Sequence, residues 1–190
     1  MVDLLVVPDF LDAAAHGELM AALRESAGAA ATVLSAAAGG AVHASVRKAT
    51  RVAVPAEVRE ALRQRLLARK AEIEAHFGVA LNDCEEPQFL RYEEGDFFVP
   101  HQDGNTPLVY DDSRHRRISA VIFLSTHSDE PTPDTYGGGS LLFHRPYSEP
   151  GEPIPAPATP GTLVLFRAET THEVTPVTHG ERYTIATWFR

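Results

Sequence analysis

The feature that most limits the fold of this chain is a series of short apolar and β-branched runs that begins after Pro87. Turn-forming Gly, Pro, Asp and Asn residues separate the runs. Seven of them are candidate strands: QFLRY, FFV, ISAVIFL, SLLF, TLVLF, EVTPV and YTIATWF. Strands this short, with no helical pattern between them, favour an antiparallel sandwich or barrel over a parallel α/β sheet.

The first part of the chain has the period of helices instead. Asp9 or Asp12 can cap a first helix that carries Leu19, Met20 and Leu23 on one side. Pro55 can open a second, longer helix that ends at Gly78. Its apolar residues recur at helical spacing and should pack on a sheet: Val58, Leu62, Leu66, Ile73 and Phe77.

The remaining segments give weaker signals. The Ala- and Gly-rich residues 27–46 are expected to hold one short strand with loose connections. Residues 127–139 and 144–161 are rich in Pro and Gly, so we expect loops at the rim of the sheet. A chain of 190 residues suggests one domain. We therefore expect residues 1–190 to form a single domain, with helical support in 1–86 and a β core in 87–190.

Composition limits the classes of partner and compartment. With 17 Lys and Arg against 26 Asp and Glu, the formal charge of −9 argues against nucleic acid as a partner. The one basic cluster, residues 114–117, is better explained as a patch beside a site. Cys84 is the only cysteine, which excludes an intrachain disulfide and is consistent with a cytoplasmic location. The first residues do not have the pattern of a signal peptide, and no apolar run approaches membrane-spanning length.

The segment VPHQDGN contains a candidate metal site. One residue separates His101 from Asp103, so on a strand both side chains share a face, while Gln102 should point to the other side. Far downstream, ETTHEV places His172 where the chain leaves the strand TLVLF. Two imidazoles and one carboxylate form the ligand set of non-haem Fe(II) oxygenases, which leaves coordination positions open. The same ligands suit Zn, Mn or Co, so ligand type alone does not identify the metal.

Arg182, ten positions after His172, narrows the choice. It begins a strand on which positions 182, 184, 186 and 188 share one face. If Arg182 and Trp188 both point into the barrel, the buried guanidinium needs an anion. A dicarboxylate that chelates the metal at one end and pairs with Arg182 at the other would supply it, as 2-oxoglutarate could. His144 is a rival metal ligand, but no anion-binding arginine lies suitably downstream of it, and His179 is expected to face solvent.

The motifs HQD, GGGSLLF, THEV and GERYTIATWF occur in this order, and together they resemble one family. The chain resembles the Fe(II)/2-oxoglutarate-dependent dioxygenases of the prolyl 4-hydroxylase-like superfamily from about Gln88 to Phe189. The resemblance implies an α+β fold with a mainly β core. That core is a double-stranded β-helix, also described as a jelly roll or cupin-like fold, flanked by N-terminal helices.

The resemblance also implies a role for individual residues. The implied iron ligands are His101, Asp103 and His172. The implied 2-oxoglutarate pocket contains Arg182, which binds the C5 carboxylate, and Tyr92, Leu141 and Trp188. Phe123 and its neighbour Ile122 stand where some animal prolyl hydroxylases bind 2-oxoglutarate with a tyrosine, so this second contact must come from Tyr92 or be absent. Arg114, Arg116 and Arg117 lie on a connection that this fold places over the site opening, so we expect them to contact substrate.

The implied activity is hydroxylation of an unactivated C–H bond. It uses Fe(II), O2 and 2-oxoglutarate, which is oxidatively decarboxylated to succinate and CO2, and ascorbate is expected to support it. Asp103 favours hydroxylation because the related halogenases have a small residue there. The expected substrate is a prolyl residue in a protein or peptide, with a free amino acid or natural product as the alternative. We expect a monomer or weak homo-oligomer.

Two alternatives come from other classes of protein. A non-catalytic sensor module could bind metal and 2-oxoglutarate and act through a partner. A zinc hydrolase could use the same three ligands, but it would give Arg182 no task.

Overall fold

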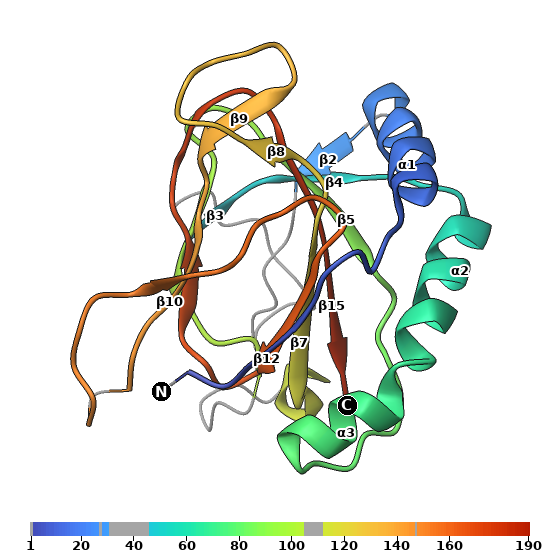
Figure 1. Cartoon of the computed structure of the whole chain (residues 1–190), viewed down its shortest axis with the longest axis vertical. Helices are drawn as coiled ribbons and strands as arrows, with labels where there is room; N and C mark the ends of the chain where they lie inside the picture. Colours follow the sequence, from blue (N-terminus) through green and yellow to red (C-terminus); the bar gives the residue numbers. More distant parts are fainter. Residues whose placement is uncertain (1, 27, 31–45, 105–111, 147) are drawn as a thin grey trace.

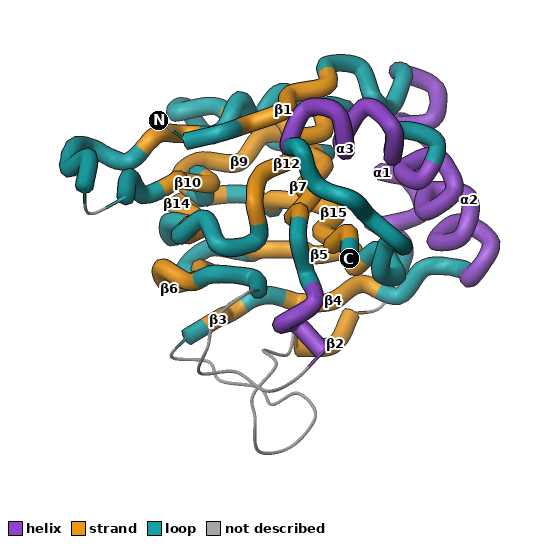
Figure 2. The backbone as a smooth tube through the Cα atoms, turned by 90° about the horizontal axis from the view of Figure 1, so that it is seen from below, coloured by secondary structure: helices purple, strands orange, loops and turns teal. Residues whose placement is uncertain are grey.

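The computed structural model describes residues 2–26, 28–30, 46–104, 112–146 and 148–190. In this part of the chain two antiparallel β-sheets enclose an interior, and three helices gather on one side of the strands (Figures 1 and 2). A smaller three-stranded sheet lies at the end marked by β8 and β9. The antiparallel sandwich or barrel expected from the short apolar runs is therefore confirmed.

The larger sheet has seven strands, and every neighbouring pair in it is antiparallel. In spatial order they are β1 (Leu4–Val7), β12 (Leu163–Arg167), β7 (Ile118–Phe123), β15 (Arg182–Phe189), β5 (Gln88–Tyr92), β4 (Thr50–Val52) and β2 (Gly28–Ala30). Side chains alternate between its faces. On β15, Tyr183 and Ile185 pack with the helices, while Arg182 and Thr184 line a pocket between the sheets.

The smaller sheets complete the β core. The five-stranded sheet contains β11 (Ile154–Pro155), β10 (Leu141–Phe143), β13 (His172–Val174), β6 (Phe97–His101) and β3 (Arg47–Lys48). The three-stranded sheet contains β14 (Val177–His179), β9 (Thr135–Gly138) and β8 (Thr126–His127). A 3-10 helix spans Asp112–His115.

Helix α1 (Ala13–Glu25) begins where a capping residue was expected. The side chain of Asp12 accepts a hydrogen bond from the backbone N–H of Ala15 at 2.9 Å. Leu19, Met20 and Leu23 are the buried residues of this helix, as predicted from their spacing. The helix thereby covers the outer face of the larger sheet.

The prediction of one long helix from Pro55 to Phe77 is wrong in one respect. The structure has two helices there, α2 (Ala56–Leu67) and α3 (Lys70–Phe77). Arg69 departs from ideal α-helical angles, at φ −91° and ψ −1°, and its backbone N–H donates to the carbonyl three residues back, on Leu66. The apolar stripe nevertheless packs on the sheet as predicted, since both halves join one core cluster. Gly78 ends α3 in the left-handed conformation, at φ 64°.

Several short strands were missed from the sequence. β1 pairs with β12 at the edge of the larger sheet, and β3 and β4 lie just after the Ala- and Gly-rich segment. Residues 127–139, expected as a loop, contain β9 and part of β8, and 144–161 contain β11. The expected strand EVTPV is divided between β13 and β14. Of the one strand expected in 27–46, Gly28–Ala30 is present and 31–45 lie outside the described residues.

Two apolar clusters occupy opposite faces of the larger sheet. One lies between this sheet and the helices, and the other lies between the two facing sheets. Within the described part of the chain, no helix combines the length and apolar character needed to cross a bilayer.

Candidate active site

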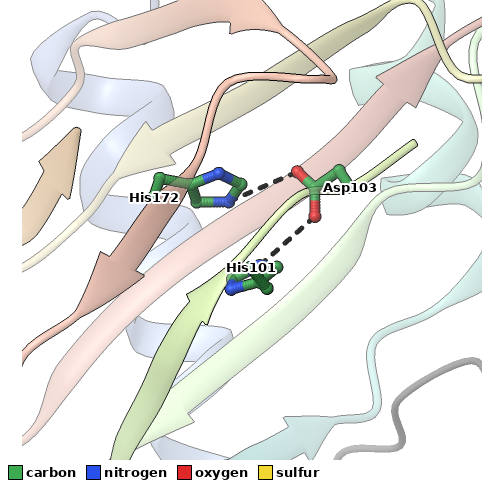
Figure 3. A group of neighbouring side chains, drawn as sticks. All are labelled: His101, Asp103 and His172. Carbon is green, nitrogen blue, oxygen red and sulfur yellow. Dashed lines mark ion pairs between the residues drawn. The ribbon is translucent and has the colours of Figure 1, made fainter. Parts of the chain in front are cut away.

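Three residues with metal-binding side chains converge at one end of the interior. His101 ends β6, Asp103 follows it, and His172 begins β13, where the antiparallel pairing sets it opposite His101. One ligand atom from each residue lies within 4.8 Å of the other two. Figure 3 shows the three side chains pointing toward one another. Gln102, between the first two, is exposed, as predicted.

Backbone carbonyls orient both imidazoles. Nδ1 of His101 donates to the carbonyl of Val99, and Nδ1 of His172 donates to that of Thr170, each at 2.8 Å. Because Nδ1 carries the proton in this arrangement, Nε2 presents its lone pair. The Nε2 atoms of His101 and His172 lie 3.4 Å and 3.5 Å from the carboxylate oxygens of Asp103.

The carboxylate of Asp103 is also held in place. The hydroxyl of Ser119, on β7, donates to its Oδ2 at 2.7 Å, and the N–H of Asp103 donates to the carbonyl of Ala168 at 2.9 Å. Ser119 was not predicted as a site residue. Its only signal in the sequence is a small polar residue inside the apolar run ISAVIFL.

The charge states of the group suit a metal ion. Burial acts to raise the pKa of Asp103, but nearby His172 and His101 and the hydroxyl of Ser119 outweigh it and hold that pKa well below its usual range. Burial lowers the pKa of His172 to about 4. At neutral pH the carboxylate is therefore ionised and His172 is neutral, which are the forms that bind metals.

Aromatic rings pack against both imidazoles. Phe98 stacks on His101 with ring centroids 3.5 Å apart and planes at 17°. Phe166 meets His172 edge-on at 4.7 Å. These contacts, together with the carbonyl bonds, restrict how either imidazole can turn.

A narrow cavity of about 50 Å³ lies between the two sheets and contains this group. His101, Asp103 and His172 line it. The four residues expected to form the cosubstrate pocket line it as well: Tyr92, Leu141, Arg182 and Trp188. The structure thus brings all seven into one pocket.

Arg182 is buried in this pocket with few polar contacts. It is 2% exposed, and its Nη1 donates to the hydroxyl of Thr184 at 3.3 Å. Its guanidinium carbon lies 5.2 Å from the ring centroid of Tyr92 and 5.6 Å from that of Phe123. Its Nε is buried without a hydrogen bond, and no carboxylate of the described residues pairs with it. A buried cation in this state fits an anionic ligand.

Two polar residues that line the pocket were not predicted as site residues. Thr184 follows Arg182 on the same face of β15 and is 2% exposed. Arg47, on β3, lines the pocket with its guanidinium 4.9 Å from the ring centroid of Phe98. Arg47 follows an Ala- and Gly-rich segment without a clear strand pattern, whereas position 184 was already expected on the same strand face as Arg182 but was given no role in the pocket.

The three arginines expected to contact substrate have different surroundings. Arg114 and Arg117 are exposed, whereas Arg116 is buried and ion-paired with Glu85 at 2.8 Å. Residues 105–111, half of the expected loop 104–117, lie outside the described residues. A substrate role for these arginines stays a prediction. The rival ligand His144 pairs with Glu173 at 3.0 Å and is not in the convergent group.

Comparisons with known proteins found a matching family model and related sequences. The family model described as "2OG-Fe(II) oxygenase superfamily" matches residues 87–190. A PKHD-type hydroxylase of Paracoccus denitrificans is 35% identical over 104 residues, which are 54% of this chain and 41% of the relative. A PKHD-type hydroxylase of Shewanella sp. (strain ANA-3) is 31% identical over 137 residues, which are 72% of this chain and 55% of the relative. The chain thus spans about half or less of the length of these relatives.

Solved structures share the fold. A Pseudomonas putida prolyl-4-hydroxylase matches with a TM-score of 0.71 and 23% identity, over 100% of this chain and 93% of that one. A Trichoplax adhaerens prolyl hydroxylase, in complex with a hypoxia inducible factor peptide fragment, matches with a TM-score of 0.74 and 15% identity, over 100% of this chain and 84% of that one. The expected α+β fold, a double-stranded β-helix flanked by N-terminal helices, is confirmed.

Proposed function

Because the chain belongs to the 2OG-Fe(II) oxygenase superfamily, we propose that it is an Fe(II)- and 2-oxoglutarate-dependent hydroxylase with His101, Asp103 and His172 as its iron ligands. One observation carries this proposal. Two imidazole nitrogens and a carboxylate converge in the same narrow pocket that contains a buried arginine without a carboxylate partner among the described residues.

The donor set fits iron in this role. Three protein ligands on one side of the ion leave positions for small ligands on the other. Arg182 is suited to the C5 carboxylate of 2-oxoglutarate, because a planar guanidinium can donate two parallel hydrogen bonds to it. The hydroxyl of Thr184, already bonded to Arg182, is a second donor at the same place. Some animal prolyl hydroxylases bind 2-oxoglutarate with a tyrosine at the position that Phe123 occupies here. The hydroxyl of Thr184 can take over the role of that tyrosine.

The other pocket residues orient the ligands and exclude water. The rings of Tyr92 and Phe123 both lie near the guanidinium of Arg182 and help to hold it in place. Leu141 and Trp188 add apolar walls, which strengthen the charge interactions inside. When bound, iron and 2-oxoglutarate supply the oxidising chemistry, in which O2 is consumed, 2-oxoglutarate is decarboxylated to succinate and CO2, and a C–H bond is hydroxylated.

We propose a prolyl residue in a protein or peptide as the substrate. The support is that the Pseudomonas and Trichoplax proteins of the same fold are prolyl hydroxylases, the second in complex with a peptide fragment. A free amino acid or natural product is the alternative substrate. Mass spectrometry of candidate substrates for the gain of one oxygen distinguishes the two. The cytoplasmic location and the monomeric or weakly oligomeric state stay predictions.

The proposal is tested with purified protein, Fe(II), 2-oxoglutarate and ascorbate as a supporting reductant. Wild-type protein should form succinate even without substrate, and His172→Ala should not. His76→Ala is the matched control, since His76 lies on α3 and pairs with Asp3 outside the pocket. If wild-type protein neither binds nor turns over 2-oxoglutarate, the proposal fails. Tight binding with no turnover would support the sensor alternative, and preferential loading with zinc would support the hydrolase.

A further inference from the structure

Arg116 joins the segment before β7 to the segment before β5 through a buried ion pair. Its Nε and Nη2 donate to the two carboxylate oxygens of Glu85 at 2.9 Å and 2.8 Å. The side chains are 8% and 13% exposed. A paired, two-bond contact of this kind sets the plane of the guanidinium as well as its position. Arg190 adds a bond to the same carboxylate at 3.0 Å.

The plane of this guanidinium matters because Trp188 lies against it. The central carbon of Arg116 is 3.6 Å from the centroid of the indole, so the two groups are stacked. The backbone of Glu85 also contacts β15 at Trp188, because the N–H of Glu85 donates to the carbonyl of Trp188 at 2.8 Å. Trp188 lines the pocket, and its indole N–H is buried without a hydrogen bond. The indole of Trp188 is therefore held by stacking on Arg116 and not by a hydrogen bond from its own N–H.

The third nitrogen of Arg116 reaches the metal-ligand segment. Its Nη1 donates to the backbone carbonyl of Asp103 at 3.3 Å. A Cβ on Gly104, the next residue, would lie 2.8 Å from the Cβ of Arg116, so the two segments are in close contact. Cross-strand pairing sets Trp188 opposite Ser119, which holds the Asp103 carboxylate. The ion pair, the indole and the metal-ligand carboxylate thus form one contiguous group.

We propose that Arg116 is a positioning residue: through its ion pair with Glu85 it holds the indole of Trp188 as a pocket wall and the backbone of Asp103 at the metal site. This inference rests on the proposed function, since that function gives Asp103 and Trp188 their roles. It differs from the expectation that Arg116 contacts substrate. All three nitrogens of the guanidinium already donate to protein groups, and the indole of Trp188 covers one of its faces. Contact with substrate is therefore left to other residues.

The chain offers a direct probe, because Trp188 is its only tryptophan. With excitation selective for tryptophan over the tyrosines, the fluorescence of the metal-free protein therefore reports on this wall and needs no turnover. In Arg116→Met the emission should shift to longer wavelength and acrylamide quenching should increase. The dissociation constant for Mn(II), measured without iron or oxygen, should rise about tenfold, as for loss of other groups that orient metal ligands. The KM for 2-oxoglutarate should rise as well.

Two more variants separate positioning from folding. Arg116→Lys keeps the charge beside Glu85 but loses the planar fork, so thermal stability should recover more than the fluorescence and Mn(II) binding do. Arg63→Met is the matched control. Arg63 bonds the carbonyl of Cys84 at 2.7 Å and pairs with Asp83, beside Glu85, but does not contact Trp188. It should lower stability and leave the emission and Mn(II) binding unchanged.

The outcomes are distinct. If the Arg116 variants match Arg63→Met in emission, quenching and Mn(II) binding, the proposal is overturned. A rise only in the KM for a prolyl substrate, with metal-free fluorescence unchanged, would also overturn it and would make Arg116 a substrate contact. Failure of the proposed function would look different, because wild-type protein itself would then not bind 2-oxoglutarate, whereas the fluorescence shift in Arg116→Met would still occur.

Discussion

Replacement of Arg182 by methionine separates a ligand-binding arginine from a structural one. Hydrogen bonds to charged groups contribute about 1.5–3 kcal/mol each. A carboxylate held by two of them would lose about 3–6 kcal/mol in Arg182→Met, which weakens 2-oxoglutarate binding about 10²- to 10⁴-fold. Arg182→Lys keeps the charge without the fork and should fall between wild type and Arg182→Met.

The same substitution should have little cost for the ligand-free protein. Arg182 is 2% exposed and has Thr184 and two ring faces as its contacts among the described residues. Replacing a buried charge that lacks a counter-ion with an apolar side chain of similar length is often neutral or stabilising. The melting temperature of metal-free Arg182→Met should therefore equal or exceed that of wild type.

The assay is anaerobic calorimetry of 2-oxoglutarate with Fe(II)-loaded protein, next to thermal unfolding of the metal-free protein. Arg91→Met is the control, since Arg91 lies one position away from Tyr92 on the opposite face of β5 and pairs with Glu93 at 2.9 Å. It should bind 2-oxoglutarate normally. If Arg182→Met weakens binding less than tenfold, or lowers the melting temperature more than Arg91→Met does, Arg182 is structural and the reasoning is refuted.

Further predictions concern single contacts. Ser119→Ala removes the hydrogen bond to Asp103 and should raise the Mn(II) dissociation constant about tenfold, whereas Ser119→Thr should retain most of the affinity; equal affinities would exclude the proposed support. Burial raises the pKa of Cys84 to about 11, so alkylation of native protein at pH 8 should be about 100-fold or more slower than that of unfolded protein, and equal rates would contradict the buried site. Gly180→Ala should destabilise the fold by about 1–3 kcal/mol, because its φ is +70° and a Cβ would lie 2.1 Å from the carbonyl of Thr135. Gly17→Ala, in α1 with nothing within 4 Å, should instead stabilise by about 1 kcal/mol, and chemical denaturation of both variants tests the contrast.

The central residues of the candidate site could be predicted because their chemistry and spacing are both distinctive. His101 and Asp103 share a strand face by simple alternation, and Arg182 follows His172 by ten positions at the start of a strand. From the sequence alone the burial of Arg182 is only a condition, and the structure supplies it. The short apolar runs after Pro87 likewise indicated an antiparallel β core. These features depend on local periodicity, which a single sequence carries.

Other parts of the site depend on pairing between distant strands. In the sequence Ser119 is one serine among others. Its contact with Asp103 exists only in the folded sheet, in which β7 pairs with β12. Arg116 looks like part of a basic surface patch, and only the tertiary structure shows that Glu85 and Trp188 bury it. Neither relation leaves a local signal, because the partners are separated by many residues.

The errors in secondary structure have a similar origin. The break at Arg69 does not interrupt the apolar period of the stripe, so the pattern alone predicts one helix. β1 is four residues long and exists as an edge strand through its pairing with β12. β9 forms in a Pro- and Gly-rich segment because Tyr136 is buried there, at 1% exposure. In each case tertiary packing outweighs local propensity.

The most direct test of the account is a crystal structure with Mn(II) and 2-oxoglutarate, grown without oxygen. We expect one metal ion bound by Nε2 of His101, Nε2 of His172 and the carboxylate of Asp103. We also expect the C5 carboxylate of 2-oxoglutarate to pair with Arg182 and Thr184. A metal ion bound elsewhere, or a 2-oxoglutarate molecule held away from Arg182, would contradict the central claim.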